Sequence, residues 1–173
     1  VPIGMTNDNL NSGRIMLFNM DGSRIWSKSF PGNPGDVVVG DINADGKEDI
    51  VFTLDYDELS DPCYDKACGG IYALDRSGKL LPGWPQRVGS RYVMSPPVLG
   101  DLNNDSQLEI FASPFNESLF ELYDAQGKML PGWPKNMEKG YYYLSSPAVI
   151  GDVNGDGNAE VVENLDRYNG NNF

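Results

Sequence analysis

The 173-residue chain is acidic, with 25 Asp and Glu against 13 Lys and Arg, a formal net charge of −12 and no histidine. This charge argues against nucleic acid and anionic membranes as partners, and no apolar run approaches the roughly 20 residues of a membrane span, so we expect no membrane insertion. The absence of histidine excludes Ser-His-Asp and Cys-His nucleophile arrangements and any histidine-ligated zinc or iron site.

Near its start the chain has two apolar runs, 15–18 and 25–26, on either side of a turn that contains Gly22. A glycine turn between alternating apolar runs is typical of a tight β-hairpin. The same pattern returns at 72–85 and 122–134, where both copies end in Pro-Gly-Trp-Pro. No segment has helical periodicity, and 20 glycines and 12 prolines interrupt the runs. We therefore expect an all-β protein.

A second motif, Gly-Asp-x-Asn-x-Asp, occurs three times and begins at Gly40, Gly100 and Gly151. Each copy lies between two apolar runs, so each predicts a loop that joins two strands. The loops place oxygen-bearing side chains at positions 1, 3, 5 and 9, counted from the first Asp. Calcium takes six to eight oxygen ligands, and a glycine at position 6 lets such a loop turn back on itself.

Each repeat therefore contains four predicted strands: two on either side of the calcium loop and two on either side of the glycine turn, the last of which ends in Pro-Gly-Trp-Pro. Four strands per repeat are the signature of a β-propeller blade of four antiparallel strands. We divide the single segment 1–173 into a half blade at 1–32, blades at 34–88 and 93–137, and a half blade at 144–173. Propellers close at roughly four to eight blades. This chain is therefore expected to be part of a larger propeller, or to close a ring by joining other chains.

These repeats resemble the FG-GAP or VCBS-type repeat of integrin α-subunit heads and many secreted bacterial proteins. The resemblance covers nearly the whole chain and implies a calcium-binding propeller with three ions. Position 7 of each loop would ligate through its backbone carbonyl. The implied ligands are Asp41, Asn43, Asp45, Lys47 and Asp49 in the first loop, Asp101, Asn103, Asp105, Gln107 and Glu109 in the second, and Asp152, Asn154, Asp156, Asn158 and Glu160 in the third.

The second loop departs from the family pattern because Ser106 stands where glycine is expected. If that position requires a positive φ, serine is strained there and the second site binds calcium more weakly. An EF-hand is a competing calcium interpretation, since the third loop has Glu163 at position 12, but EF-hands need flanking helices. A third interpretation is that the loops are polar hairpin turns without metal, which does not explain the matched carboxylates.

The two cysteines, Cys63 and Cys68, lie in a loop bounded by Pro and Gly. The even count and short spacing predict a local disulfide, which implies an oxidising, extracellular or cell-surface location. A redox pair or half of a metal site is the alternative.

Three tryptophans are predicted to be structural. Trp84 and Trp133 recur at one position of the repeat, and Trp26 is expected to be a third packing residue.

Up-and-down strand order predicts that the calcium loops and the glycine hairpins lie on one face. The opposite face would then carry the insertion at 55–70 and the aromatic residues Tyr92, Tyr141 and Tyr142. Variable loops on a rigid scaffold commonly bind partners, and tyrosines stack on sugars or anchor proteins. The alternative for Tyr92 and Tyr143 is that they wedge between blades.

We therefore expect a calcium-stabilised extracellular module for binding or adhesion, with a carbohydrate or protein surface as ligand and no catalytic site. A structural component of a surface layer or filament is one alternative. The other is the propeller part of a polysaccharide lyase-like enzyme, because some such lyases are built on calcium-rich propellers. Paired carboxylates run glycoside chemistry, but nearly every conspicuous Asp or Glu here has a calcium role.

Overall fold

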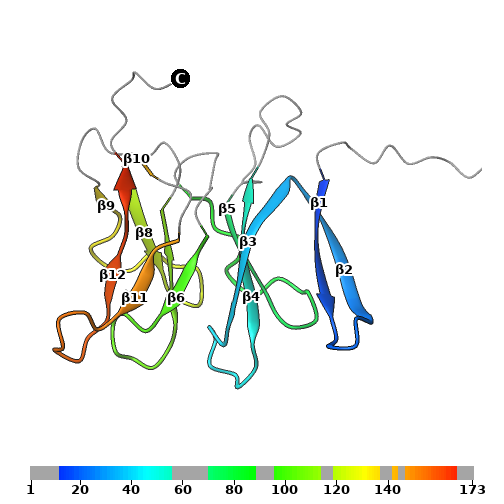
Figure 1. Ribbon diagram of the computed structural model, residues 1–173, viewed down its shortest axis with the longest axis horizontal. Coiled ribbons are helices and arrows are strands. Elements are labelled where there is room, and N and C mark those ends of the chain that lie inside the picture. The colour runs from blue at the N-terminus through cyan, green and yellow to red at the C-terminus, as the bar shows by residue number, and fades with distance from the viewer. Residues whose placement is uncertain are drawn as a thin grey trace, which may run out of the picture.

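The computed structural model describes residues 12–55, 70–88, 96–113, 119–136, 142–143 and 147–166. The described residues form thirteen β-strands and no helix, arranged as antiparallel sheets of two to four strands (Figure 1). The expectation of an all-β fold is thus confirmed. Within this part of the chain there is also no helix that could cross a membrane.

The sheets follow one another in chain order. The first holds β1 (Ser12–Phe18) and β2 (Arg24–Pro31), and the second holds β3 (Asn33–Gly40), β4 (Asp49–Asp55) and β5 (Gly70–Leu74). The third holds β6 (Val98–Gly100), β7 (Glu109–Ala112), β8 (Leu119–Tyr123) and β9 (Lys135–Asn136). β11 (Val149–Gly151) pairs with β12 (Glu160–Val162), and β10 (Tyr142–Tyr143) pairs with β13 (Leu165–Asp166).

The sheets pack face to face, so that each internal sheet is covered on both sides. Successive side chains of a strand point to opposite faces. In β4, Phe52 and Leu54 therefore join one core with β1 and β2, whereas Val51 joins another core with β7 and β8. This double coverage explains why β4 has apolar residues on both faces and is buried at every position before Asp55.

Three cores alternate with the sheets. The first lies between β1–β2 and β3–β5, where Phe30 meets Phe52 edge to face at 5.0 Å between ring centroids. The second lies between β3–β5 and β6–β9, where Trp84 meets Tyr123 at 6.2 Å. The third lies between β6–β9 and β11–β12 and is built around Phe111. Each sheet is thus held by its neighbours rather than by a single central core.

The glycine hairpins form as predicted. Gly22, Gly78 and Gly127 each adopt a positive φ, of 83°, 81° and 73°. In the second hairpin the backbone N–H of Asp75 donates to the carbonyl of Lys79 at 2.8 Å, and the third repeats this contact. A left-handed residue is what a tight antiparallel turn requires, and glycine adopts it without a Cβ penalty.

The fourth strand of the repeat differs from the prediction. We expected it to end in the Pro-Gly-Trp-Pro segment, but that segment interrupts it. In the second sheet the fourth strand is reduced to two bridges, Leu80 with Leu74 before the segment and Gln86 with Ile71 after it. In the third sheet Met129 bridges Tyr123 before the segment, and β9 begins after it. The reason is that Pro cannot donate to a ladder, and Gly83 turns the chain with a φ of 87°.

Tryptophan side chains tie neighbouring sheets together, as the sequence predicted for packing residues. The indole N–H of Trp84 donates to the carbonyl of Ala125 in the next hairpin at 2.9 Å. Trp26 makes the same contact one sheet earlier, with the carbonyl of Arg76 at 2.9 Å. Trp133 packs against the third core.

The loops that connect the first and second strands all lie at one edge of the stack. In Figure 1 the β3–β4, β6–β7 and β11–β12 loops are at the bottom, beside the β1–β2 turn. The predicted sorting of calcium loops and glycine hairpins onto one face therefore agrees with the described residues.

The buried tryptophan contact generates a stability prediction. Trp84→Phe keeps the aromatic packing but leaves the carbonyl of Ala125 buried without its donor, so we expect a loss of about 1–3 kcal/mol in the free energy of unfolding. Trp26→Phe is the matched control, because the carbonyl of Arg76 is exposed and can bond to water. Equal losses in the two variants, measured by denaturant unfolding, would contradict this assignment.

Candidate metal-binding loops

Strand pairing brings the two ends of each loop together. The glycine before each loop is paired with the acidic residue at position 9: Gly40 with Asp49, Gly100 with Glu109 and Gly151 with Glu160. Since the first Asp follows that glycine directly, positions 1 and 9 start from adjacent backbone positions. Each loop joins two strands, so an EF-hand, which needs flanking helices, does not describe these loops.

The first Asp of each loop organises the turn through hydrogen bonds. Its carboxylate accepts the backbone N–H groups of positions 5 and 6, while the Asn at position 3 accepts the N–H of position 5. In the first loop, Asp45 donates to Asp41 at 3.0 Å and to Asn43 at 2.9 Å, and Gly46 donates to Asp41 at 2.8 Å. The other two loops repeat all three bonds within the same narrow range.

Position 6 does require a left-handed backbone in every loop. Its φ is 80° at Gly46, 68° at Ser106 and 90° at Gly157. The sequence predicted strain at Ser106 if position 6 requires a positive φ, and it does. Residues other than glycine and asparagine rarely adopt this conformation. The second loop therefore carries strain that the other two lack.

A second left-handed position escaped the sequence analysis. Position 4 also has a positive φ, of 57° at Ala44, 60° at Asn104 and 78° at Gly155. Asn and Gly adopt this conformation readily, but alanine gives no such signal in a sequence.

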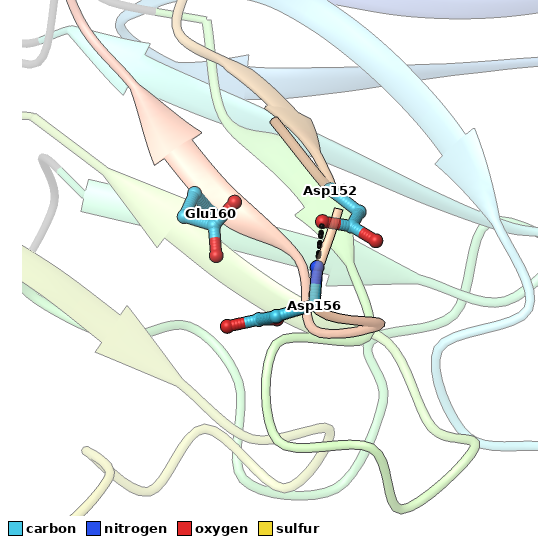
Figure 2. Close-up of side chains that lie close together, drawn as sticks. All are labelled: Asp152, Asp156 and Glu160. Atoms are coloured by element: carbon cyan, nitrogen blue, oxygen red, sulfur yellow. Dashed lines mark hydrogen bonds between the residues drawn. The ribbon is translucent and has the colours of Figure 1, made fainter. Parts of the chain in front are cut away.

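The third loop brings its three carboxylates closest together. Oxygens of Asp152, Asp156 and Glu160 lie within 4.8 Å of one another. Figure 2 shows Asp152 at the end of β11, Asp156 on the turn and Glu160 at the start of β12. The amide of Asn154 also lies here, since its Nδ2 donates to Glu160 at 2.9 Å. Four of the five predicted ligands therefore converge, and the amide of Asn158 bonds to Asp156 at 2.8 Å.

The first loop contains a buried carboxylate oxygen that lacks a partner. Asp49 is 2% exposed, and its Oδ2 accepts no hydrogen bond from any described residue. Burial, with a further contribution from the neighbouring charge of Asp45, raises the pKa of the Asp49 carboxyl to about 6. Leaving such an oxygen unpaired is costly, and a cation beside it would remove the cost.

The second loop is held by an amide between two carboxylates. Nδ2 of Asn103 donates to Asp105 at 3.1 Å and to Glu109 at 2.9 Å. Glu109 is 1% exposed, and burial raises its pKa, with Asp105 and Asp101 adding to the increase. The amide thus links two of the predicted carboxylate ligands, but among the described residues only the third loop brings all three of its carboxylates within 4.8 Å of one another.

The residues fit a hard cation. Carboxylate and amide oxygens are what calcium prefers, and the backbone N–H groups of positions 5 and 6 hold both carboxylate oxygens of the first Asp, so the loop is ordered before an ion binds. The side chain at position 7 differs between the loops. In the first loop Lys47 forms an ion pair with Asp45 at 3.3 Å. In the third loop the backbone and side chain of Asn158 donate to Asp156, and these hydrogen bonds lower the pKa of the Asp156 carboxyl. When bound, the ion would supply positive charge among like-charged carboxylates.

A contact between loops was also not anticipated. Nδ2 of Asn104 donates to Oδ1 of Asn158, which links the second loop to the third. Both residues lie at loop positions whose side chains the motif leaves variable.

Several predicted residues cannot be placed. Cys63, Cys68, Tyr92 and Tyr141 lie outside the described residues, as does most of the insertion at 55–70. Tyr142 is in β10, where its backbone pairs with Asp166.

Comparisons with known proteins give little. No family model matches the chain, and no curated protein matches it. Among solved structures, the chain is similar to the Vibrio cholerae biofilm matrix protein Bap1, with a TM-score of 0.47 and 22% sequence identity. The match covers 78% of this chain but only 23% of Bap1.

The strained serine generates a prediction for the second loop. Ser106→Gly should relieve the left-handed strain and raise the free energy of unfolding by about 1 kcal/mol, while strengthening calcium binding at that loop. Gly46→Ser is the matched reverse change in the first loop and should weaken both. Calorimetric titration with calcium and denaturant unfolding measure the two effects. Weaker binding in Ser106→Gly would refute the role of strain.

Proposed function

We propose that the chain is a calcium-stabilised extracellular β-propeller module for binding or adhesion, built from FG-GAP or VCBS-type repeats. The observation that carries the proposal is the set of three loops with the same hydrogen bonds, each gathering carboxylates at one edge of the stacked sheets. Each sheet is interpreted as a blade or part of one.

The propeller interpretation rests on how the sheets repeat. Adjacent sheets pack through continuous apolar cores, and β6 lies between β3 and β11, so first strands of successive sheets are neighbours. Sheets that stack radially with their first strands innermost are the arrangement of propeller blades. The same tryptophan-to-carbonyl contact between consecutive sheets supports a regular rotation from one blade to the next.

Calcium has a defined physical task in this proposal. Each loop holds three carboxylates, and their mutual repulsion falls when a divalent cation binds among them. Burial makes the penalty largest at Asp49 and Glu109, which are both almost inaccessible to water. The ions therefore stabilise the β3–β4, β6–β7 and β11–β12 hairpins by reducing the repulsion within their loops.

Binding is favoured over catalysis by where the acidic groups lie. Burial raises the pKa of Asp49, Glu109 and Glu163, and Glu121, which is also buried, accepts a hydrogen bond from the hydroxyl of Tyr123 at 2.7 Å. The first two belong to the calcium loops. Glu163 is half-buried and accepts a hydrogen bond from Ser113 of the neighbouring sheet at 3.1 Å. A carbohydrate or protein ligand would then bind to the opposite edge, where the sequence places its tyrosines.

Chelation tests the calcium part of the proposal. Removal of calcium with EGTA should lower the melting temperature, and excess calcium should restore it, because an ion that binds only the folded state stabilises it by mass action. Asp152→Ala should reduce the calcium-dependent part of that shift, whereas the exposed Asp36→Asn on β3 should leave it unchanged. Identical melting curves in chelator and in calcium would refute the proposal.

The ligand part has a separate test. Alanine at Tyr92, Tyr141 and Tyr142 together should abolish capture on carbohydrate or extracellular-protein arrays while preserving calcium affinity and the melting temperature. Turnover of a polysaccharide by the purified chain, lost on mutation of a carboxylate outside the loops, would instead favour the lyase-like function.

A further inference from the structure

The three calcium loops differ in the hydrogen bonds that the chain itself gives to the carboxylate at position 9. In the second loop both oxygens of Glu109 have a partner: Oε2 accepts the backbone N–H of Leu102 at 2.8 Å, and Oε1 accepts Nδ2 of Asn103 at 2.9 Å. In the third loop Glu160 is bonded in the same two ways, with Asn154 in the place of Asn103. The amide at position 3 thus supplies a donor to the carboxylate at position 9 in both loops.

The first loop lacks this donor. Its position 9 is Asp49, whose side chain is one methylene shorter than that of glutamate. Oδ2 of Asp49 is buried, and within the described residues neither the amide of Asn43 at position 3 nor any other group donates to it. The ammonium of Lys47 pairs instead with the exposed Asp45 at 3.3 Å. The first loop therefore contains a buried charge that the chain leaves without a partner.

This difference ranks the loops as cation sites. A cation in the second or third loop competes with the position 3 amide for the carboxylate, whereas a cation in the first loop gives the buried oxygen of Asp49 its first partner. Because an unpaired buried charge is costly, filling the first loop relieves a penalty that the other two do not carry, and we expect its calcium affinity to be about tenfold higher. The left-handed Ser106 lowers the affinity of the second loop further.

The second and third loops are also connected to each other. Nδ2 of Asn104 donates to Oδ1 of Asn158 in the next sheet. The Asn158 amide is fixed at its other end, because its Nδ2 and its backbone N–H both donate to Oδ1 of Asp156 at 2.8 Å. Asn104 itself lies between Asn103 and Asp105, which are predicted ligands of the second loop. One pair of side chains thus joins the ligand sets of the two loops.

The first loop cannot make the same contact with the second. Its position 4 is Ala44, which has the same left-handed backbone as Asn104, with a φ of 57° against 60°, but no side-chain donor. The first loop therefore differs from the other two in both respects: its carboxylate lacks an internal donor, and its position 4 cannot bond to a neighbouring loop.

We propose that the three loops form two classes of calcium site: the first loop holds a permanent ion, and the second and third loops are a coupled pair that exchanges calcium with the surroundings. This inference rests on the proposed function and names how that function is regulated. A fall in calcium concentration then loosens the β6–β7 and β11–β12 hairpins together, while the β3–β4 hairpin stays fixed.

The coupling has a physical cause in the ordering of side chains. Ordering a loop around an ion costs conformational entropy, and the Asn104–Asn158 contact lets one loop order part of the other. A loop whose neighbour is filled therefore loses less entropy when it binds, and by linkage the effect is equal in both directions. Repulsion between two bound ions opposes this coupling, but ionic screening weakens the repulsion at physiological salt, where the Debye length is about 8 Å.

Metal analysis separates the two classes. The chain is purified in calcium and dialysed against calcium-free buffer that contains no chelator, after which one calcium ion per chain should remain. Asp45→Asn removes a charged ligand from the first loop and should leave no ion, whereas Asp156→Asn, the matched change in the third loop, should still leave one. Retention of the ion by Asp45→Asn but not by Asp156→Asn would overturn the ranking, and so would retention of all three ions by the unmodified chain.

Site-resolved titration tests the coupling. NMR signals of the backbone N–H groups of Ser106 and Gly157 report calcium binding to the second and third loops separately. Asp156→Asn should weaken the third loop directly and the second loop about fivefold through the contact, and Asp105→Asn should weaken the third loop by the same factor. A second loop whose affinity is unchanged or higher in Asp156→Asn would overturn the coupling.

Asn104→Gly isolates the contact between the loops. Glycine keeps the left-handed backbone without strain but removes the donor to Asn158, so Asp156→Asn in this background should no longer weaken the second loop. Ala44→Gly is the matched change in the first loop and should leave the coupling intact. Persistence of the fivefold effect in Asn104→Gly would overturn the assignment of the coupling to Asn104.

Calcium-free unfolding tests the role of the position 3 amide. Asn103→Ala and Asn43→Ala both remove the acceptor for the backbone N–H of position 5, but only Asn103→Ala also removes a donor from the buried Glu109. In excess EGTA, Asn103→Ala should therefore cause the larger fall in melting temperature. A fall equal to or smaller than that of Asn43→Ala would overturn the internal-donor argument.

This inference and the proposed function fail in different ways. A chain that binds no calcium in any loop in the NMR and metal measurements refutes both. Three ions that bind with equal affinity, and without any effect of Asp156→Asn on the second loop, leave the proposed function standing and overturn only the two classes of site.

Discussion

Three carboxylates in one tight loop repel one another, and the rest of the structure depends on how that repulsion is balanced. The loop cannot relax, because strand pairing fixes positions 1 and 9 side by side and the first Asp holds the turn through backbone N–H groups. In the first loop the balance is least complete, since Asp49 is buried with one oxygen unpaired. In the second and third loops an Asn amide lies among the carboxylates instead. A divalent cation bound there would supply the same neutralisation with far more charge.

The loops matter beyond their own edge because no sheet is stable alone. β4 and β7 bury both faces, so each sheet needs a neighbour on either side, and a loop that opens would shift the strands that form two cores. Glycine sets the spacing of this stack, since a Cβ at Gly40 or Gly100 would collide with the next sheet. The rigidity of the loops and the close spacing of the sheets therefore depend on each other.

The sequence predicted the parts of this structure that local chemistry determines. The glycine hairpins and the strands around each loop follow from turn residues and β-branched runs, and the strain at Ser106 follows from its place in the motif. Ala44 could not be predicted to adopt a positive φ, because its conformation is imposed by the hydrogen bonds of the loop around it. Trp26 was expected to pack, but its equivalence to Trp84 in bonding the next hairpin depends on the sheet stacking, which single-sequence patterns do not encode.

Anomalous X-ray diffraction from crystals grown with calcium tests the central claim most directly, because it locates ions without assuming their ligands. The account predicts three peaks per chain, one inside each loop, with oxygens of the named residues at about 2.3–2.6 Å. If one loop shows a weaker peak, it should be the one that contains Ser106. Well-ordered loops without an ion in any of the three, at millimolar calcium, would contradict the claim that calcium holds this protein together.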